Sequence, residues 1–241
     1  MPENVLMSAT FPILLGVLAF AAVPARAELI SLSASGTINP NSTASTTIPA
    51  GTPWRFEIIY NTDAPDRDFE LTGTPDPTFG LYDNEGAIPA LTFFHYSAAT
   101  YEVTLDDATD FGPFSAIHIS FGGTHAIDIN LNAAALFPPL DGRAVSFHAD
   151  FGDFSHSIFT SDALPTNTAI GLASFQDASV TLLPSGGAIF GSLNDMTSFK
   201  IAPVPEPSTC ALAIIGLHVL LLSRRAGPPT TGARHKTWAR V

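Results

Sequence analysis

Apolar and polar side chains alternate with a period of two along much of the chain between Glu28 and Pro203. Ile117, Ile119 and Phe121 are separated by single polar residues, and the run 127–131 repeats the pattern. Strict alternation is typical of β-strands that bury one face. Patterns of this kind predict ten strands, at 29–38, 54–60, 91–96, 100–105, 117–121, 127–131, 145–151, 157–160, 179–183 and 197–201.

Glycine and proline interrupt the same part of the chain too often for long helices. Between Glu28 and Pro203 there are 14 Gly and 13 Pro among 176 residues, and proline removes a backbone donor that a helix needs. Gly122-Gly123 lies between two predicted strands and indicates a tight hairpin turn. We therefore expect an all-β domain, an antiparallel β-sandwich or jelly roll, flanked by an N-terminal signal helix and a C-terminal hydrophobic helix. The stretch 61–85 is acidic and rich in Pro and Gly, and is expected to be a long surface loop.

The N-terminus carries a short apolar run of the kind found in secretion signals. Residues 11–23 read FPILLGVLAFAAV, which is too short for a typical membrane span. Small residues at Ala25 and Ala27 fit a signal-peptidase site with cleavage before Glu28. We therefore expect residues 1–27 to be a signal peptide and signal peptidase to be a processing partner.

A second apolar run, at 210–222, lies between a proline-rich motif and a basic pair. The motif consists of Val204, Pro205, Glu206, Pro207 and Ser208. Its prolines favour an extended, accessible backbone. The apolar run would halt translocation, and Arg224 and Arg225 would hold its far end in the cytoplasm by the positive-inside bias.

This three-part arrangement resembles the PEP-CTERM sorting signal, which joins a Pro-Glu-Pro motif, a short hydrophobic helix and a basic cluster. The resemblance covers 204–225, a segment also catalogued as an ice-binding protein C-terminal domain. It implies that an exosortase recognises Glu206 and cuts near it. It also implies an inner-membrane intermediate, held through the C-terminal helix, followed by the cell surface or extracellular matrix of a Gram-negative bacterium. The folded domain would then be 28–203, and the basic stretch 226–241 is expected to be a disordered tail.

Charge is distributed unevenly along the chain. The formal net charge is -12, but the expected domain 28–203 has 20 acidic and 4 basic residues, a balance of -16. Such a surface disfavours nucleic acid and anionic lipid as partners and remains compatible with cations or neutral glycans. The one cysteine, Cys210, lies outside this domain, so the domain must fold without a disulfide.

Candidate metal ligands are scattered and match no known motif. The histidines of the domain form no H-x-H or H-E-x-x-H pair, which zinc sites favour. His118, His125 and His148 fall at or beside polar positions of predicted strands and are expected to be surface side chains. A metal site assembled across strands from His118, His148 and Asp150 is the alternative. We expect no cofactor, with structural calcium as an alternative because loop carboxylates suit that cation. The calcium candidates are Asp63, Asp66, Asp68, Asp106, Asp107 and Asp110.

No catalytic motif is present between Glu28 and Pro203: there is no G-x-S-x-G, no glycine-rich phosphate loop and no nucleophilic cysteine. We therefore expect a non-enzymatic surface or matrix protein that is held in, or released into, extracellular polysaccharide. The alternatives are a carbohydrate-binding module and a secreted hydrolase with paired carboxylates. An exposed aromatic platform would favour the first alternative. The candidates for such a platform are Trp54, Tyr60, Tyr82, Tyr96 and Tyr101.

Overall fold

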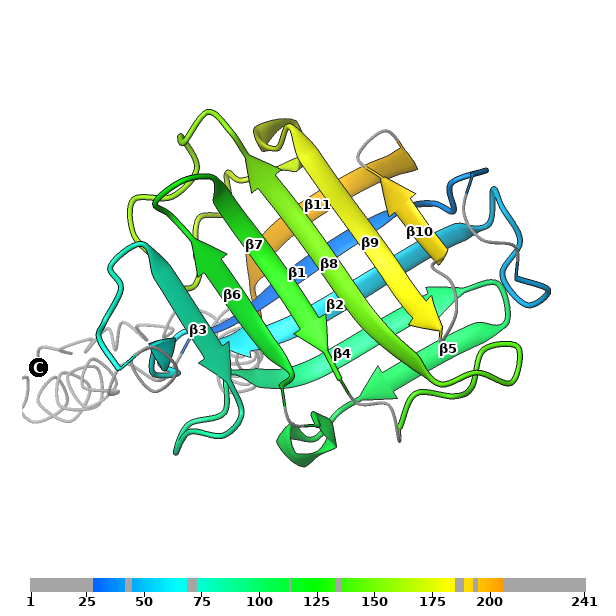
Figure 1. Ribbon diagram of the computed structural model, residues 1–241, viewed down its shortest axis with the longest axis horizontal. Helices are drawn as coiled ribbons and strands as arrows, with labels where there is room; N and C mark the ends of the chain where they lie inside the picture. Colours follow the sequence, from blue (N-terminus) through cyan, green and yellow to red (C-terminus); the bar gives the residue numbers. More distant parts are fainter. Residues whose placement is uncertain are drawn as a thin grey trace, which may run out of the picture. The chain divides into compact units, whose positions relative to one another are not determined.

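The structure is a computed structural model that describes residues 28–41, 45–68, 73–112, 114–132, 136–184, 189–192 and 195–205. These residues form eleven strands and two short 3-10 helices. The strands fall into two antiparallel sheets, whose strands cross each other in projection (Figure 1). The chain's internal contacts place the end of this unit at Val204.

The first sheet has five strands in the order β11-β1-β2-β4-β5. They are β1 (Leu29–Thr37), β2 (Pro53–Asn61), β4 (Leu91–Ala98), β5 (Tyr101–Leu105) and β11 (Met196–Pro203). Burial in β1 alternates at every residue, so that its apolar side chains face inward and its serines face outward. This follows from the two-residue repeat of a strand, which turns successive side chains to opposite faces.

The second sheet has six strands in the order β10-β9-β8-β7-β6-β3. They are β3 (Phe79–Asp83), β6 (Ala116–Ser120), β7 (His125–Leu131), β8 (Val145–Asp153), β9 (Asp177–Pro184) and β10 (Ile189–Ser192). The hairpin expected at Gly122-Gly123 is confirmed, because β6 and β7 pair on either side of it. The inner positions of β7 are apolar from Ile127 to Leu131, as the alternation predicts.

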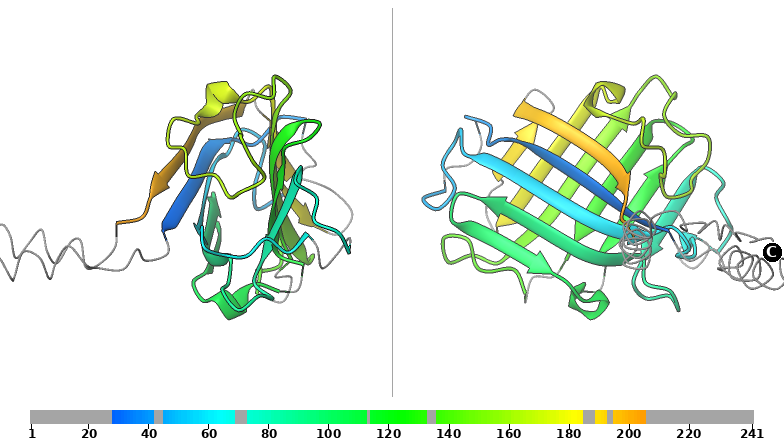
Figure 2. Two further views of the ribbon diagram at one scale, coloured as in Figure 1. Left: turned by 90° about the vertical axis from the view of Figure 1, so that its left-hand side faces the viewer. Right: turned by 180° about the vertical axis from the view of Figure 1, so that it is seen from behind.

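The two sheets face each other (Figure 2), and their inner faces share one hydrophobic core. Phenylalanine rings fill its centre. Phe56 of β2 meets Phe147 of β8 at a centroid distance of 5.1 Å, and Phe151 of β8 meets Phe199 of β11 at 4.8 Å. Such edge-to-face ring pairs contribute roughly 0.5–1.5 kcal/mol each beyond the burial of their area. These contacts join strands of opposite sheets, so they fix how the sheets pack.

The first and last strands of the unit are neighbours. β1 pairs with β11 along its length, and beyond that ladder the Val204 amide donates to the Leu29 carbonyl at 2.8 Å. The start and the end of the folded chain therefore leave the same end of the five-stranded sheet. Both predicted processing sites adjoin this end.

The prediction of an all-β antiparallel fold is confirmed, and nine of the ten predicted strands coincide with observed ones. The prediction of a strand at 157–160 is wrong. Its amides bond to side chains and not to a neighbouring strand: the Ser157 and Ile158 amides donate to the Asp153 carboxylate, and the Phe159 amide donates to Nδ1 of His125.

The prediction of a long loop at 61–85 is also wrong in part, because Phe79–Asp83 forms the edge strand β3 and pairs with β6. β10 was not predicted. The predicted signal helix and C-terminal hydrophobic helix lie outside the described residues. Within the described ranges, no helix is long and apolar enough to cross a membrane.

Candidate functional site

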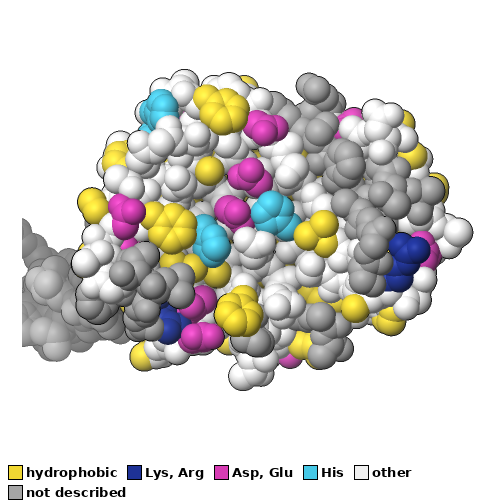
Figure 3. Space-filling view, viewed as in Figure 1, with side chains coloured by type: hydrophobic (Ala, Val, Ile, Leu, Met, Phe, Trp, Pro, Cys, Tyr) yellow, Lys and Arg dark blue, Asp and Glu magenta, His cyan; other side chains and the backbone are white. Residues whose placement is uncertain are grey.

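The outer face of the six-stranded sheet brings together titratable side chains from three adjacent strands. Strand pairing places His118 of β6 opposite Asp128 of β7, and Asp128 opposite Asp150 of β8. In the next row, Asn130 of β7 lies opposite His148 of β8. Alternate residues of a strand share one face and register-paired residues are neighbours, so these five side chains share one surface. We refer to them as the His–Asp cluster; Figure 3 shows histidine and acidic side chains together at the centre of this face.

Asp128 is the centre of the His–Asp cluster. Nδ2 of Asn130 donates a hydrogen bond to Oδ1 of Asp128 at 2.6 Å, and Nε2 of His148 lies 3.4 Å from the same oxygen. The side chains of His148 and Asp128 remain 29% and 34% exposed. The carboxylate is thus held by two neighbours on one oxygen while the group as a whole stays accessible to a ligand.

The environment shifts the pKa values of three groups in the cluster. The hydrogen bond to Asp128 raises the pKa of His148, although partial burial opposes the shift. Burial lowers the pKa of His118 and outweighs the charge of Asp128. Burial, together with repulsion from Asp128, raises the pKa of Asp150. At neutral pH the face therefore presents a neutral imidazole at His118 next to the carboxylate of Asp128.

Aromatic side chains border the cluster. The ring of Phe79 meets His118 edge-on, with centroids 5.6 Å apart. Phe114 is 80% exposed and has a φ of 69°, an uncommon backbone conformation for a bulky residue. A cavity of about 420 Å³ adjoins the cluster at this point. It is lined by Leu81, Asp83, Glu85, Phe114, Ala116, His118 and Asn130.

This surface has the groups needed to bind a polyhydroxy ligand. Imidazole and amide side chains can both donate hydrogen bonds to hydroxyl groups and accept them, and carboxylates accept them. The exposed ring of Phe114 and the half-buried ring of Phe79 offer apolar surface to C–H groups. The row next to His118, Asp128 and Asp150 contains Ala126 and Gly152. Ala126 is half-buried and Gly152 is buried, so these two positions add no polar side chain to the face.

The aromatic residues named from the sequence do not form an exposed platform. Trp54 and the four tyrosines are all buried, at 0–5% exposure. Tyr60, Tyr82 and Tyr101 donate their hydroxyls to the carbonyls of Pro165, Asp162 and Pro138. All five lie at inner positions of their strands, so the aromatic residues on the surface are phenylalanines.

The acidic loop residues serve mainly as acceptors for nearby backbone amides. Oδ1 of Asp66 accepts from the Asp68 and Leu81 amides, at 3.0 and 2.9 Å. Asp107 accepts from the Thr109 amide and caps the 3-10 helix Ala108–Asp110. Among the described residues, no group of three or more His, Cys, Asp or Glu side chains could hold a metal ion. Structural calcium stays a prediction, and so does a metal at His118, His148 and Asp150.

The remaining candidates are placed as follows. Asp63 lies exposed in the turn after β2, Asp68 is buried and accepts from the Asp76 amide, and Asp110 accepts from the Asp106 and Asp107 amides.

The prediction that His125 is a surface side chain is wrong. The sequence pattern placed it at or beside the polar face, but its side chain is 4% exposed and stacks among Phe121, His156 and Phe159. The reason is the parity of β7, in which residue 125 shares the inner face with Ile127. The alternation read back from Ile127 could have shown this.

The export signals lie at the edge of the described chain. Glu28 is exposed and immediately precedes β1, while Val204 and Pro205 follow β11. Ala25, Ala27, Glu206, Pro207, Ser208, Arg224 and Arg225 lie outside the described residues. Cleavage at these positions therefore stays a prediction from the sequence.

Comparison with known proteins gives no relative. No family model matches the chain, and no curated protein and no solved structure matches it.

Proposed function

We propose that the chain is an exported, non-enzymatic protein of the cell surface or extracellular matrix, and that its folded unit binds neutral polysaccharide. The observation that carries this proposal is the His–Asp cluster with its flanking phenylalanines on an open sheet face. In fold terms, we propose a β-sandwich of the jelly-roll kind. Its chain passes between the sheets at β2–β3, β3–β4, β5–β6 and β10–β11.

The chemistry of this face favours a neutral sugar over a charged one. Asp128 and Asp150 lie in the cluster, and Asp83 and Glu85 line the adjoining cavity. Asp83 and Glu85 pair with Arg67, at 2.6 and 3.5 Å, so repulsion of an anionic chain at short range comes from the carboxylates of the cluster. They accept hydrogen bonds from sugar hydroxyls, and Phe79 and Phe114 supply apolar surface nearby.

The processing proposal rests on the terminal motifs. Signal peptidase would cut before Glu28, and an exosortase would cut near Glu206 after the C-terminal helix had held the protein in the inner membrane. The pairing of β1 with β11 supports cleavage at these two places, because the folded ladder reaches from Leu29 to Val204 and leaves both cuts outside it. Removal of both ends would leave the sheets intact.

Binding is tested with the full-length chain in detergent, immobilised and probed with neutral oligosaccharides. Asp128→Asn should abolish or strongly weaken binding, because it removes the negative charge at the centre of the cluster and replaces one of the two acceptor oxygens with a donor NH2 group. Asp106→Asn, an exposed carboxylate at the end of β5, is the matched control and should bind normally. Equal binding by the two variants, or no neutral glycan bound by the native chain, would contradict the proposal. Release of new reducing ends would instead indicate the hydrolase alternative.

A further inference from the structure

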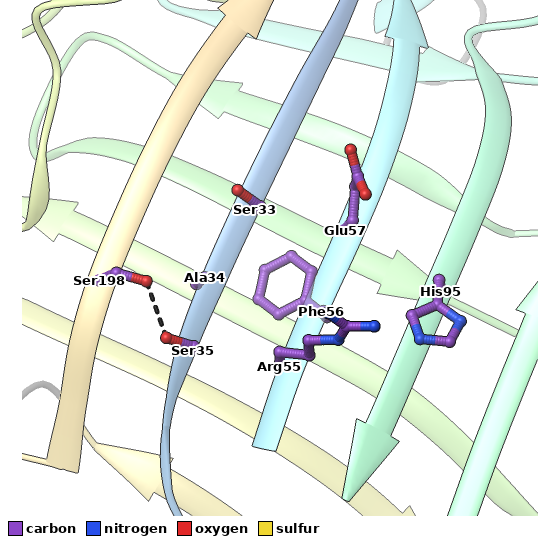
Figure 4. A pocket seen from close by; sticks show the side chains of 8 residues that line it. All are labelled: Ser33, Ala34, Ser35, Arg55, Phe56, Glu57, His95 and Ser198. Atoms are coloured by element: carbon purple, nitrogen blue, oxygen red, sulfur yellow. Dashed lines mark hydrogen bonds between the residues drawn. The ribbon is translucent and has the colours of Figure 1, made fainter. Parts of the chain in front are cut away.

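We infer that the outer face of the five-stranded sheet carries a second binding site, for a carboxylate-bearing saccharide such as a uronate. A groove of about 300 Å³ runs across β11, β1, β2 and β4 on this face (Figure 4). The side chains exposed along it come from Ser33, Ser35, Arg55, Glu57, His95 and Ser198. This site is separate from the His–Asp cluster, which lies on the other sheet.

Strand register explains why these groups meet. Ser35 of β1 lies between Ser198 of β11 and Arg55 of β2, and Arg55 lies opposite Ser97 of β4. The adjacent row runs through Lys200, Ser33, Glu57 and His95 in the same strand order. Two parallel rows of hydroxyl and charged groups therefore cross four strands.

Arg55 is the group suited to an anion. Its only hydrogen bond within the described chain is from Nε to Oγ of Ser97, at 3.4 Å. Glu57, two residues along the same face, accepts from Ser31 at 2.6 Å and points away from the guanidinium (Figure 4). The guanidinium thus keeps free donors on its outer edge, which is the geometry that binds a carboxylate in a bidentate manner.

One buried donor reinforces the assignment. Among the described residues, only His95 Nε2 and Trp54 Nε1 are buried side-chain polar atoms without a hydrogen-bond partner. His95 lines the groove, and its Nε2 lies 3.8 Å from a carboxylate oxygen of Glu102. Trp54 lies at an inner position of β2, on the core side of the sheet, and is not part of this site. Buried polar groups are rarely left unpaired. The hydroxyl of Thr104 lies 3.1 Å from Nδ1 of His95, and Nε2 carries the proton in the tautomer in which Thr104 donates.

Local charge distinguishes this face from the opposite one. Arg55 and Lys200 are two of the four Lys and Arg residues between Glu28 and Pro203, and they stand beside only Glu57 and Glu102 in the two rows. The net charge of the domain does not prevent binding, because at physiological salt the screening length is about 8 Å. The groove therefore selects an acidic sugar where the His–Asp cluster selects a neutral one.

The test is binding of a short oligogalacturonate to the full-length chain, with a cello-oligosaccharide as the neutral comparison. Arg55→Gln should weaken oligogalacturonate binding about tenfold to a hundredfold, the usual effect of losing a charge-assisted hydrogen bond. Arg143→Gln removes the same charge from an exposed turn away from the groove and should leave binding unchanged. Arg55→Lys keeps the charge without the planar fork and should give an intermediate loss.

Failure of native protein to bind oligogalacturonate would overturn the inference. So would equal loss in Arg55→Gln and Arg143→Gln, because binding would then follow total charge and not the groove. The result is separable from the proposed function. Asp128→Asn should impair only the neutral ligand, and Arg55→Gln only the acidic one.

Discussion

The carboxylate of Asp153 provides the sharpest test of how this unit is held together. It lies at the end of β8, is 0% exposed, and accepts hydrogen bonds from the segment that follows. The amides of Ser155, Ser157 and Ile158 donate to it at 2.8, 2.7 and 3.2 Å, and the hydroxyls of Ser155 and Ser157 donate at 2.5 and 3.2 Å. One side chain thus replaces the strand neighbour that residues 155–158 lack.

Asp153→Ala should cost about 3–4 kcal/mol of unfolding free energy. The substitution leaves three backbone donors without an acceptor, at about 1–3 kcal/mol each, and the low end applies because a surface segment can admit water. This is a large fraction of the 5–15 kcal/mol typical of a domain. Urea unfolding followed by circular dichroism would measure it as a lower midpoint with an unchanged slope.

Asp141→Ala is the matched control for burial. Asp141 accepts three hydrogen bonds where Asp153 accepts five, from the Thr46 amide and from the hydroxyls of Thr46 and Thr47, and it is exposed. Water can replace it, so its loss should be clearly smaller. If Asp153→Ala lost less than about 1 kcal/mol, or no more than Asp141→Ala, the assigned role of the buried carboxylate would be refuted.

Acid should affect the same group in a defined direction. Burial alone would raise the pKa of Asp153, but hydrogen bonds from Ser155 and Ser157 outweigh it and hold the pKa below its ordinary value. A lowered pKa contributes stability that is complete above the unfolded-state pKa of about 3.9 and is lost as pH falls through the folded-state pKa. Native protein should therefore lose stability below about pH 4 more steeply than Asp153→Asn.

Three further predictions follow from other parts of the unit. NMR titration should give His148 a pKa above the ordinary histidine value and His118 a pKa below it. Asp128→Asn should lower the pKa of His148. The stability that His148 contributes should be present at low pH and lost as the pH rises through its raised pKa. Gly36→Ala should destabilise by about 1–3 kcal/mol in urea, because a methyl group there overlaps the Asp195 and Met196 backbone and the Trp54 ring, whereas Gly123→Ala, with no neighbour, should be tolerated; equal effects would contradict the packing. Chelation with EDTA should leave the thermal midpoint unchanged, because Asp66 and Asp107 already accept backbone amides; a lower midpoint would indicate structural calcium.

Much of the sheet structure was readable from the sequence, because alternation directly reports which face of a strand is buried. It predicted β7 and β8 and the hairpin at Gly122-Gly123. It failed where the backbone bonds to side chains, as at 157–160, and where a short edge strand lies within an acidic, proline-rich stretch, as at Phe79–Asp83.

The binding surfaces were only partly predictable. His118, His148 and Asp150 could be named as polar-face residues, but their meeting at Asp128 depends on the register between β6, β7 and β8. The groove at Arg55 depends on pairing between β1 and β11, which are separated by most of the chain. Trp54 and the tyrosines suggested a platform by residue type, and only the structure shows that they point into the core.

The most direct test of a glycan-binding face on the six-stranded sheet is an NMR measurement on the histidine rings. Neutral oligosaccharide is added to the full-length chain, and the imidazole signals of His95, His118, His148 and His156 are followed together. Binding at the His–Asp cluster predicts that the His118 and His148 signals shift in a saturable manner, while those of His95 and His156 stay in place. Unmoved His118 and His148 signals, or shifts confined to the other two rings, would contradict it.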